Sequence, residues 1–97
     1  MKRYRIIWSP LAEEKYLEIL TFLIENWSLS IAEEFESKVE SLLFRLTIHQ
    51  NLCQESKIHK NLRRCVVTPQ TSIVYRLRDG NIIEIVAFFD NRSNHKF

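Results

Sequence analysis

The stretch Tyr4-Arg5-Ile6-Ile7-Trp8-Ser9-Pro10-Leu11-Ala12 decides how the chain begins its fold. Tyr4, Ile6 and Trp8 alternate with Arg5 and Ile7, which predicts a strand with one more deeply buried face. Ser9 can accept a hydrogen bond from the first turn of a helix, and Pro10 suits that turn because its missing N–H would have no partner there. We therefore expect a strand that passes directly into a helix.

Two amphipathic helices are predicted to follow this strand. Asn26-Trp27-Ser28 ends the first, and Ser30-Ile31-Ala32-Glu33 is a capping box that starts the second. Apolar residues recur at spacings of three and four: Ala12, Tyr16, Ile19, Leu20, Leu23 and Trp27 in the first helix, and Ala32, Phe35, Val39, Leu42, Leu43 and Leu46 in the second. Because the connection is short, the helices should form an antiparallel hairpin with both stripes facing a sheet.

The rest of the chain predicts strands. Residues 49–61 show no clear period and are expected to form a loop or an irregular helical turn. Leu62–Thr68, Ser72–Arg78 and Ile82–Phe88 are rich in Val, Ile and Tyr and bounded by Pro69 and Asp79-Gly80. The predicted fold is α+β, in the order β-α-α-β-β-β. One domain spans residues 1–97, with the helical hairpin on one face of a twisted, mainly antiparallel four-stranded sheet.

The Asp79-Gly80 pair sets the predicted register of the last hairpin. A two-residue loop would place Arg78 opposite Asn81 and Arg76 opposite Ile83. One face then carries Ile73, Tyr75, Leu77, Ile82, Val86 and Phe88, interrupted by Glu84, and the other carries Val74, Arg76, Arg78, Ile83, Ile85 and Ala87. Two arginines are costly to bury unpaired, so we expect the second face to be open. Its mixture of apolar and cationic side chains is typical of a protein-binding surface, unless residues 91–97 fold back over it with Phe97 as a plug.

Composition limits the classes of protein that the chain can be. Its 97 residues are 45% hydrophobic with 11% aromatic, which predicts a packed globular domain. No apolar run approaches the ~20 residues that span a bilayer, and a cytoplasmic protein is expected. Cys53 and Cys65 could pair, but two cysteines without other cross-links are interpreted as structural thiols in a reducing compartment, Cys65 in a strand and Cys53 in a loop.

The sequence carries no pattern for a metal or a small-molecule cofactor. His49, His59 and His95 lack ligand spacing, and Cys53 and Cys65 form no CxxC pair. The single glycine excludes a Gly-rich nucleotide loop. Charge is uneven: residues 1–40 hold 5 basic and 8 acidic side chains, whereas residues 41–97 hold 9 and 4, which gives −3 and +5. The basic half indicates a polyanion or an acidic partner, although solvated acidic helix faces would explain the asymmetry equally well.

Several stretches together resemble small bacterial toxins of the RelE/ParE superfamily. They cover essentially the whole chain and are Trp8-Ser9-Pro10-Leu11-Ala12, Ala32 with Phe35, Leu62-Arg63-Arg64, Ile73-Val74-Tyr75-Arg76, Ile82-Ile83-Glu84-Ile85 and Phe89-Asp90-Asn91-Arg92. The Pro and Gly that the family usually has before the second strand are absent here. The resemblance implies the toxin of a type II toxin–antitoxin module, neutralised by a cognate antitoxin. The expected antitoxin site is the open face with Val74, Arg76, Arg78, Ile83, Ile85 and Ala87.

Two activities occur in this superfamily, inhibition of DNA gyrase and ribosome-dependent cleavage of mRNA. Metal-independent cleavage would need cations around the phosphate and a proton carrier, for which the candidates are Arg63, Arg64, Arg76, Arg92 and His95. Arg63 and Arg64 are adjacent in a strand, so at most one can join a given site.

The C-terminal tail bears on the choice between the two activities. Residues 92–97 lack the Tyr that nuclease members commonly carry near their C-termini, which favours the ParE-like branch acting on gyrase. An mRNA endonuclease is the alternative. A non-catalytic nucleic-acid-binding module, indicated by the basic half, and an inactive toxin relative also remain open.

Overall fold

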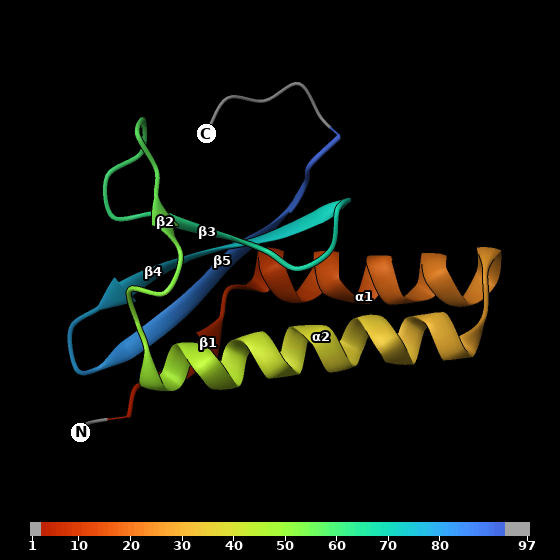
Figure 1. The fold of residues 1–97 in the computed structure, drawn as a ribbon, viewed down its shortest axis with the longest axis horizontal. Coiled ribbons are helices and arrows are strands. Elements are labelled where there is room, and N and C mark those ends of the chain that lie inside the picture. The colour runs from red at the N-terminus through yellow and green to blue at the C-terminus, as the bar shows by residue number, and fades with distance from the viewer. Residues whose placement is uncertain (1–2, 93–97) are drawn as a thin grey trace.

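A computed structural model describes residues 3–92 and shows two long helices packed beside a twisted sheet (Figure 1). In chain order the elements are β1 (Arg5–Trp8), α1 (Pro10–Asn26), α2 (Leu29–Ile48), β2 (Gln54–Glu55), β3 (Arg63–Val66), β4 (Thr71–Arg78) and β5 (Ile82–Asp90). The helices form the antiparallel hairpin that the sequence predicts, and the hairpin extends past the end of the sheet (Figure 1).

The sheet has five strands in the order β1-β5-β4-β3-β2, with β1 parallel to β5 and the other pairs antiparallel. The predicted mainly antiparallel sheet is confirmed, but the predicted count of four strands is wrong. The additional strand is β2, which lies in the segment 49–61 that was expected to be a loop. Its two residues pair Gln54 with Arg64 and Glu55 with Arg63. A two-residue strand of polar residues has no apolar alternation by which a sequence could reveal it.

Serines start both helices. The Ser9 hydroxyl accepts a hydrogen bond from the Ala12 N–H at 3.0 Å and donates one to the Val86 carbonyl oxygen at 2.8 Å, so the cap of α1 is also tied to β5. The start of α2 lies two residues earlier than predicted. The cap is Ser28, whose hydroxyl accepts from the Ile31 N–H at 3.1 Å, and the expected capping box at Ser30 lies inside the helix.

The helices cover one face of the sheet. The buried cluster contains Ala12, Phe35, Val39, Leu42, Leu46, Cys65, Ile73, Tyr75, Ile83, Ile85 and Phe88, from both helices and from β3, β4 and β5. An aromatic group closes one end of it, with Tyr16 stacked on Phe88 at 5.3 Å and Trp8 stacked on Phe88 at 5.7 Å between ring centroids. The prediction that helices cover one face only is therefore confirmed for the described residues.

The register of the β4–β5 hairpin differs from the prediction by one residue. Arg78 lies opposite Ile82, not Asn81, so the loop contains Asp79, Gly80 and Asn81. Gly80 and Asn81 both have positive φ, at 84° and 58°, conformations that glycine and asparagine adopt more easily than other residues. A shift of one residue moves each side chain of a strand to the other face. Ile83 and Ile85, predicted on the open face, are therefore fully buried under the helices.

A β-bulge restores the predicted faces farther along β5. Tyr75 pairs with Ile85 but Val74 pairs with Ala87, which leaves Val86 as the extra residue. Beyond it Phe88 faces the core and Ala87 the open side, as predicted. Ile82 and Val86 were predicted on the core face. Ile82 instead pairs with Arg78 on the open face, and the Val86 carbonyl oxygen accepts the Ser9 hydroxyl.

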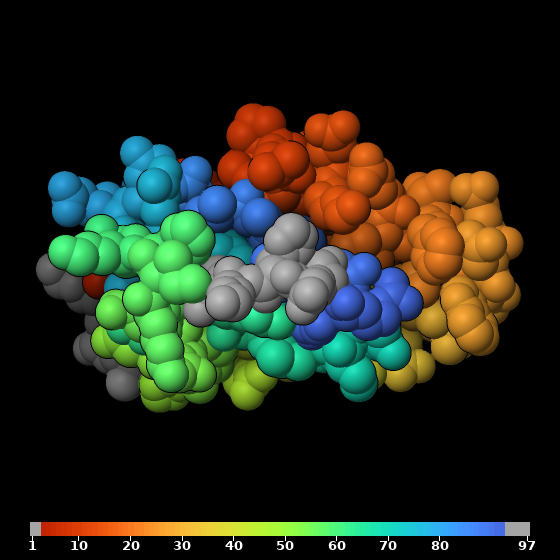
Figure 2. Space-filling view, turned by 90° about the horizontal axis from the view of Figure 1, so that it is seen from above, coloured from red at the N-terminus to blue at the C-terminus, as the bar shows by residue number. Residues whose placement is uncertain are grey.

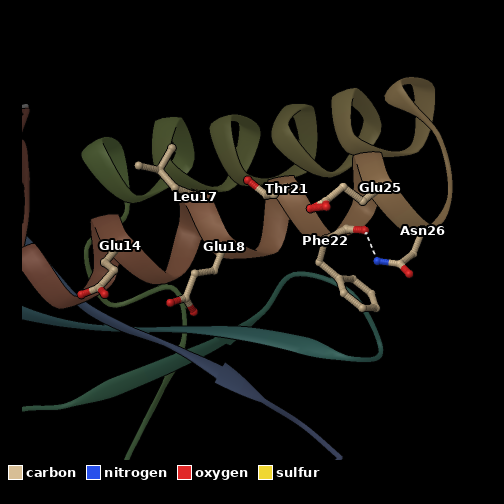
Figure 3. A pocket seen from close by; sticks show the side chains of 7 residues that line it. All are labelled: Glu14, Leu17, Glu18, Thr21, Phe22, Glu25 and Asn26. Carbon is tan, nitrogen blue, oxygen red and sulfur yellow. Dashed lines mark hydrogen bonds between the residues drawn. The ribbon is translucent and has the colours of Figure 1, made fainter.

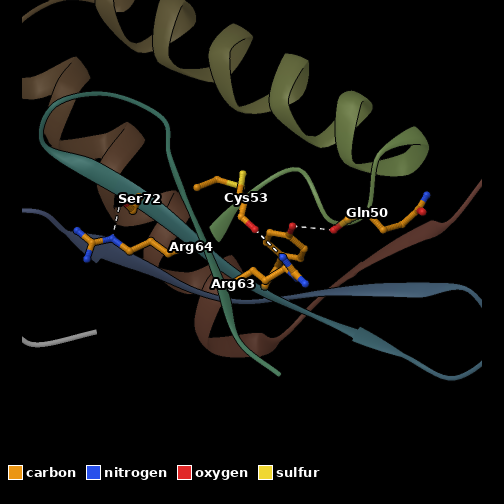
Figure 4. Close-up of a disulfide and its surroundings, with 7 residues drawn as sticks. Gln50, Cys53, Arg63, Arg64 and Ser72 are labelled. Carbon is orange, nitrogen blue, oxygen red and sulfur yellow. Dashed lines mark hydrogen bonds between the residues drawn. A yellow bond between two sulfur atoms is a disulfide. The ribbon is translucent and has the colours of Figure 1, made fainter. Parts of the chain in front are cut away.

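The two cysteines form a disulfide bond between Cys53 and Cys65, so the prediction of two thiols is wrong for this structure. Their places in the fold agree with the prediction, because Cys65 is buried in β3 and Cys53 precedes β2 in a loop. The disulfide joins β3 to the segment that follows α2 (Figure 4). Among the residues that the structure describes, neither helix is long and apolar enough to cross a membrane.

The molecule is elongated, with extents of 39 × 30 × 22 Å. Figure 2 shows the green segment around β2 at one end and the orange turn between α1 and α2 at the other. The two surfaces considered as sites below, the open face of the sheet and a groove beside the helical hairpin, lie between these ends.

Candidate functional site

The open face of β4 and β5 carries an ion-pair cluster. Arg76 donates from Nε to the Glu84 carboxylate at 2.6 Å, and Arg78 lies 3.6 Å from the same oxygen. Glu84, which interrupted the predicted apolar face, thus belongs to the open face opposite Arg76. Of the six residues predicted to form the antitoxin surface, Arg76, Arg78 and Ala87 lie on this face with some exposure. Val74 lies there as well but is buried, at 4% exposure.

Arg64 belongs to a second polar cluster on the same face. Its guanidinium donates to Ser72 Oγ at 3.2 Å and to Asn91 Oδ1 at 2.6 Å, and it lies 4.7 Å from the centre of the Phe89 ring. Asn91 also accepts from the Ser72 hydroxyl and donates to the Thr68 and Pro69 carbonyl oxygens. Asn91 therefore connects the end of β5 to the β3–β4 connection through these hydrogen bonds. The sequence did not predict this role.

Arg63 and Arg64 point to opposite sides of β3, as their adjacency predicts (Figure 4). Arg63 donates to the Cys53 carbonyl oxygen at 2.8 Å and lies 3.6 Å from Glu55. Arg92 pairs with Asp90 at 3.1 Å at the end of β5. The four candidate arginines thus have four different sets of partners and do not face one common point. His95 lies outside the described residues.

A groove of about 700 Å³ runs between the helical hairpin and the far end of the sheet. One wall is formed by α1 from Lys15 onward and by the first half of α2, and the other by the β3–β4 connection and the end of β5. The lining residues are Lys15, Glu18, Ile19, Phe22, Leu23, Trp27, Ile31, Glu34, Phe35, Lys38, Thr68, Gln70, Thr71, Phe88, Phe89, Asp90 and Arg92. The floor is apolar and the rim carries charges of both signs.

Trp27 and Phe22 are the most exposed large apolar residues of this groove, at 71% and 57%. The sequence pattern placed Trp27 in the core-facing stripe, and that part of the prediction is wrong. The hairpin extends past the sheet, so its last turn has no β-strand beneath it to cover Trp27 (Figure 1). Length alone did not predict this, because helices of 17 and 20 residues at about 1.5 Å per residue are about as long as β4 and β5, which have 8 and 9 residues at about 3.3 Å per residue.

The outer side of α1 forms a shallower depression that differs in charge from the groove. Glu14, Glu18 and Glu25 line it together with Leu17, Thr21, Phe22 and Asn26 (Figure 3). Its polar side chains are partly satisfied within the helix, since the Asn26 amide donates to the Phe22 carbonyl oxygen at 2.9 Å. Acidic side chains at helical spacing on a solvent face form a solvated surface, and we assign no ligand to it.

Four ionisable groups among the described residues have shifted pKa values, and one of them is Arg92, whose pKa is raised by its hydrogen bonds to Asp90. Burial raises the pKa of Tyr16 to about 12, helped by the carboxylates of Glu36 and Glu40. Burial also raises the pKa of Tyr75, whose hydroxyl donates to the Gln50 carbonyl oxygen at 2.7 Å. Hydrogen bonds from Arg92 lower the pKa of Asp90. None of these shifts brings a proton carrier close to neutral pH.

Within residues 3–92 no group of three or more His, Cys, Asp or Glu side chains is arranged to hold a metal ion. The described residues form two candidate surfaces, a cationic sheet face and an apolar groove. Both surfaces are built on a two-helix hairpin that covers one face of an antiparallel sheet.

This architecture is that of small toxins of the RelE/ParE type. The family model described as ParE toxin of type II toxin–antitoxin system, parDE, matches residues 6–95, and the chain belongs to this family. Two solved structures share the fold. A chain of the chromosomal ParDE toxin–antitoxin system from P. aeruginosa superposes with a TM-score of 0.75 at 14% identity, covering 91% of this chain and 96% of that chain. The YoeB dimer from Staphylococcus aureus gives 0.58 at 20% identity, covering 88% and 93%. No functionally curated protein matches the sequence significantly.

Proposed function

We propose that this ParE-family chain acts in the cytoplasm as the toxin of a toxin–antitoxin pair, that a cognate antitoxin neutralises it, and that its target is DNA gyrase. The observation that carries the proposal is the match of the ParE toxin family to residues 6–95. The arrangement of the arginines supports it. Metal-independent RNA cleavage needs several cations around one phosphate, whereas Arg63, Arg64, Arg76 and Arg92 each have separate partners.

The groove is the better of the two surfaces for the main antitoxin contact. Burial of apolar area stabilises association by roughly 25 cal/mol per Å², and the groove exposes Phe22, Trp27 and Ile31 to solvent. The spacing of its apolar lining along α1 suits the apolar face of an amphipathic helix, with charged side chains of the partner meeting the rim. We therefore assign the antitoxin's helical part to the groove.

The open face contributes a second contact for an acidic stretch of the same antitoxin. Arg76 and Arg78 share the single carboxylate of Glu84, so the cluster keeps a net positive charge that an anionic segment can neutralise. Ala87, which pairs with Val74 farther along the same face, adds a small apolar side chain to this surface. Ile83 and Ile85 take no part, because they are fully buried in the core.

The target is tested with the purified chain and its antitoxin. Inhibition of gyrase-catalysed DNA supercoiling, relieved by one equivalent of antitoxin, is the expected result. Cleavage of translated mRNA at positions that depend on the ribosome, with supercoiling intact, would contradict it and assign the RelE-like activity. Binding to RNA or DNA that weakens steeply with salt, with neither gyrase inhibition nor mRNA cleavage, would instead indicate a nucleic-acid-binding module. No activity in any assay would indicate an inactive relative.

The groove is tested by replacing Trp27. Trp27→Ala should weaken antitoxin affinity by about tenfold or more, because buried Trp side chains dominate many interfaces. Phe44→Ala is the matched control, since Phe44 is an aromatic residue of the same hairpin, 56% exposed, that does not line the groove. Equal effects of the two changes in a titration calorimeter would remove the groove from the proposal while leaving the target untouched.

A further inference from the structure

The Cys53–Cys65 disulfide joins two parts of the chain that differ sharply in burial. Cys65 lies in the core cluster and is 2% exposed, whereas Cys53 is half-buried at the start of the segment that leads through β2 to β3. We define residues 53–62 as the latch segment. Ser56 is its single buried residue, and Ile58 within it is 56% exposed, so apolar packing contributes little to holding the segment in place.

Much of the hydrogen bonding of the latch segment is internal. The Ser56 hydroxyl accepts from the Ile58 and His59 N–H groups, and the Ser56 N–H donates to the Leu62 carbonyl oxygen at 2.8 Å. Such bonds shape the segment without attaching it to the core. Attachments to the rest of the fold include the two-residue pairing of β2 with β3, the contacts of Arg63 with the Cys53 carbonyl oxygen and the Glu55 carboxylate, a hydrogen bond between the Cys53 backbone and Tyr75, and the disulfide.

Two of these attachments, the β2–β3 pairing and the Arg63 contact, depend on the position of Cys53. The Cys53 carbonyl oxygen accepts the Arg63 guanidinium at 2.8 Å, and Gln54, the next residue, begins β2 (Figure 4). A two-residue strand at the edge of a sheet is marginal by itself. Breaking the covalent link would therefore loosen β2 and the Arg63 contact together.

We propose that the disulfide is a redox-sensitive latch. When it is closed, it holds β2 on β3 and keeps the Arg63 side chain, 22% exposed, against the Cys53 carbonyl. When it is opened, the latch segment detaches and the Arg63 guanidinium becomes available to an anionic group. Reversible disulfides of this kind occur in reducing compartments as redox sensors, where permanent structural disulfides are rare. The proposal does not depend on the identity of the toxin's target.

The reaction is thiol–disulfide exchange with a thiol reductant of the glutathione or dithiol class. A reductant thiolate attacks Cys53 Sγ, which is the more accessible sulfur, and the Cys65 thiolate leaves and takes up a proton. A second reductant thiolate displaces the Cys53 thiolate from the mixed disulfide, and Cys53 is protonated in turn. The balance is two electrons and two protons, giving two protein thiols and one oxidised reductant disulfide.

The test uses the full chain, oxidised or reduced with dithiothreitol, and follows amide hydrogen exchange by mass spectrometry. On reduction, exchange across residues 53–62 should accelerate by about tenfold or more and the segment should remain much less protected than α2 and β5, because local opening exposes the released segment while the rest of the chain stays folded. Cys53→Ala, never reduced, should match the reduced protein. In parallel, labelling of Arg63 by a dicarbonyl reagent should rise several-fold while the exposed Arg45 serves as an internal standard.

Three results would overturn the latch. Unchanged exchange over residues 53–62 in protein whose two thiols are shown by alkylation would mean that the segment does not need the bond. Equal protection of residues 53–62 and of α2 and β5 after reduction would mean that the segment opens only when the whole chain unfolds. Failure of the thiols to form the bond with glutathione disulfide would mean that it is not part of the native chemistry.

Discussion

The two faces of strands β4 and β5 are made by alternate residues of the same segments and differ in almost every property. On the covered face Ile73, Tyr75, Ile83 and Ile85 are each 0% exposed beneath the helices. On the open face Arg76 and Arg78 share Glu84, and their side chains are about half exposed. The difference teaches that the covered face supplies the apolar burial of the fold, while the other face keeps charged side chains in contact with solvent.

The largest expected effect comes from comparing an isoleucine on the covered face with one on the open face. Ile85→Ala should lower the free energy of unfolding by about 3 kcal/mol, because it leaves a cavity in a packed core. Ile82→Ala, the matched change on the open face, should cost less than about 1 kcal/mol because Ile82 is only partly buried. The measurement is urea denaturation followed by circular dichroism.

Similar losses for the two variants would contradict the assignment of faces. If Ile85→Ala does not fold, Ile85→Val should still cost about 1 kcal/mol and keep the comparison usable. The register predicted from the sequence alone gives the opposite order, with Ile82 as the costly position. The same pair of variants therefore decides between the two registers.

The next test concerns the bond that fastens the latch segment to the covered face. The disulfide closes a loop with a sequence separation of 12, and restricting the unfolded chain in this way contributes about 3 kcal/mol in the chain-entropy treatment. Cys53→Ala should lose about that much, and dithiothreitol should lower the stability of the unaltered protein by a similar amount. The reductant should leave Cys53→Ala unchanged. A further loss in that variant would show that the reductant acts elsewhere.

The sequence predicted the helices and the general fold because their signals are long and redundant. The apolar stripe of α2 repeats over five turns, and Phe35, Val39, Leu42 and Leu46 are all buried as expected. The Ser9-Pro10 corner combines a cap with a proline that fits only the first turn. Because such patterns extend over many residues, the prediction of a helix stays correct when its boundary is misplaced by one or two residues, as at the Ser28 cap.

The faces of β5 could not be predicted because they depend on a single residue of loop length. Asp79-Gly80 favours a two-residue loop, but the positive φ angles fall on Gly80 and Asn81 and the loop has three residues. The bulge at Val86 then moves the following side chains back to the faces predicted for them. No alternation pattern in the sequence reveals this bulge. For the same reason the predicted face of the sheet was correct for Val74, Arg76, Arg78 and Ala87 and wrong for Ile83 and Ile85.

The site could be predicted only in part, because its geometry depends on contacts between distant segments. The basic residues were named in the sequence analysis, but their partners were not. Arg64 and its partner Asn91 are 27 positions apart in the sequence, and Arg63 and Cys53, whose carbonyl oxygen it contacts, are 10 positions apart. The groove was missed because it depends on how far the helical hairpin extends past the sheet. The sequence alone carries no direct measure of that offset.

A smaller effect is expected on the open face itself. Arg76→Ala removes the 2.6 Å contact to Glu84 and should cost at most about 1 kcal/mol, since exposed ion pairs contribute little. Arg78→Ala, with its 3.6 Å contact, should cost less. A double-mutant cycle between Arg76 and Glu84 measures the pair, and its coupling should shrink with added salt. A coupling of several kcal/mol would mean that the open face also carries stability.

The smallest effect concerns Asp90 at the end of β5, where the covered face ends and the groove begins. The Arg92 side chain and N–H donate hydrogen bonds to its carboxylate and hold its pKa below the usual value. Since the folded-state pKa is lowered, the stabilisation is present above the unfolded pKa and is lost as the pH falls through the folded value. A titration followed by carboxyl NMR should show this lowered pKa and a return toward 3.8 in Arg92→Ala. Arg92→Lys, which keeps the charge but not the forked hydrogen bonds, should fall between the two. A pKa unchanged in Arg92→Ala would mean that Arg92 does not hold Asp90 in solution, and that the guanidinium at the rim of the groove is available to a partner from the start.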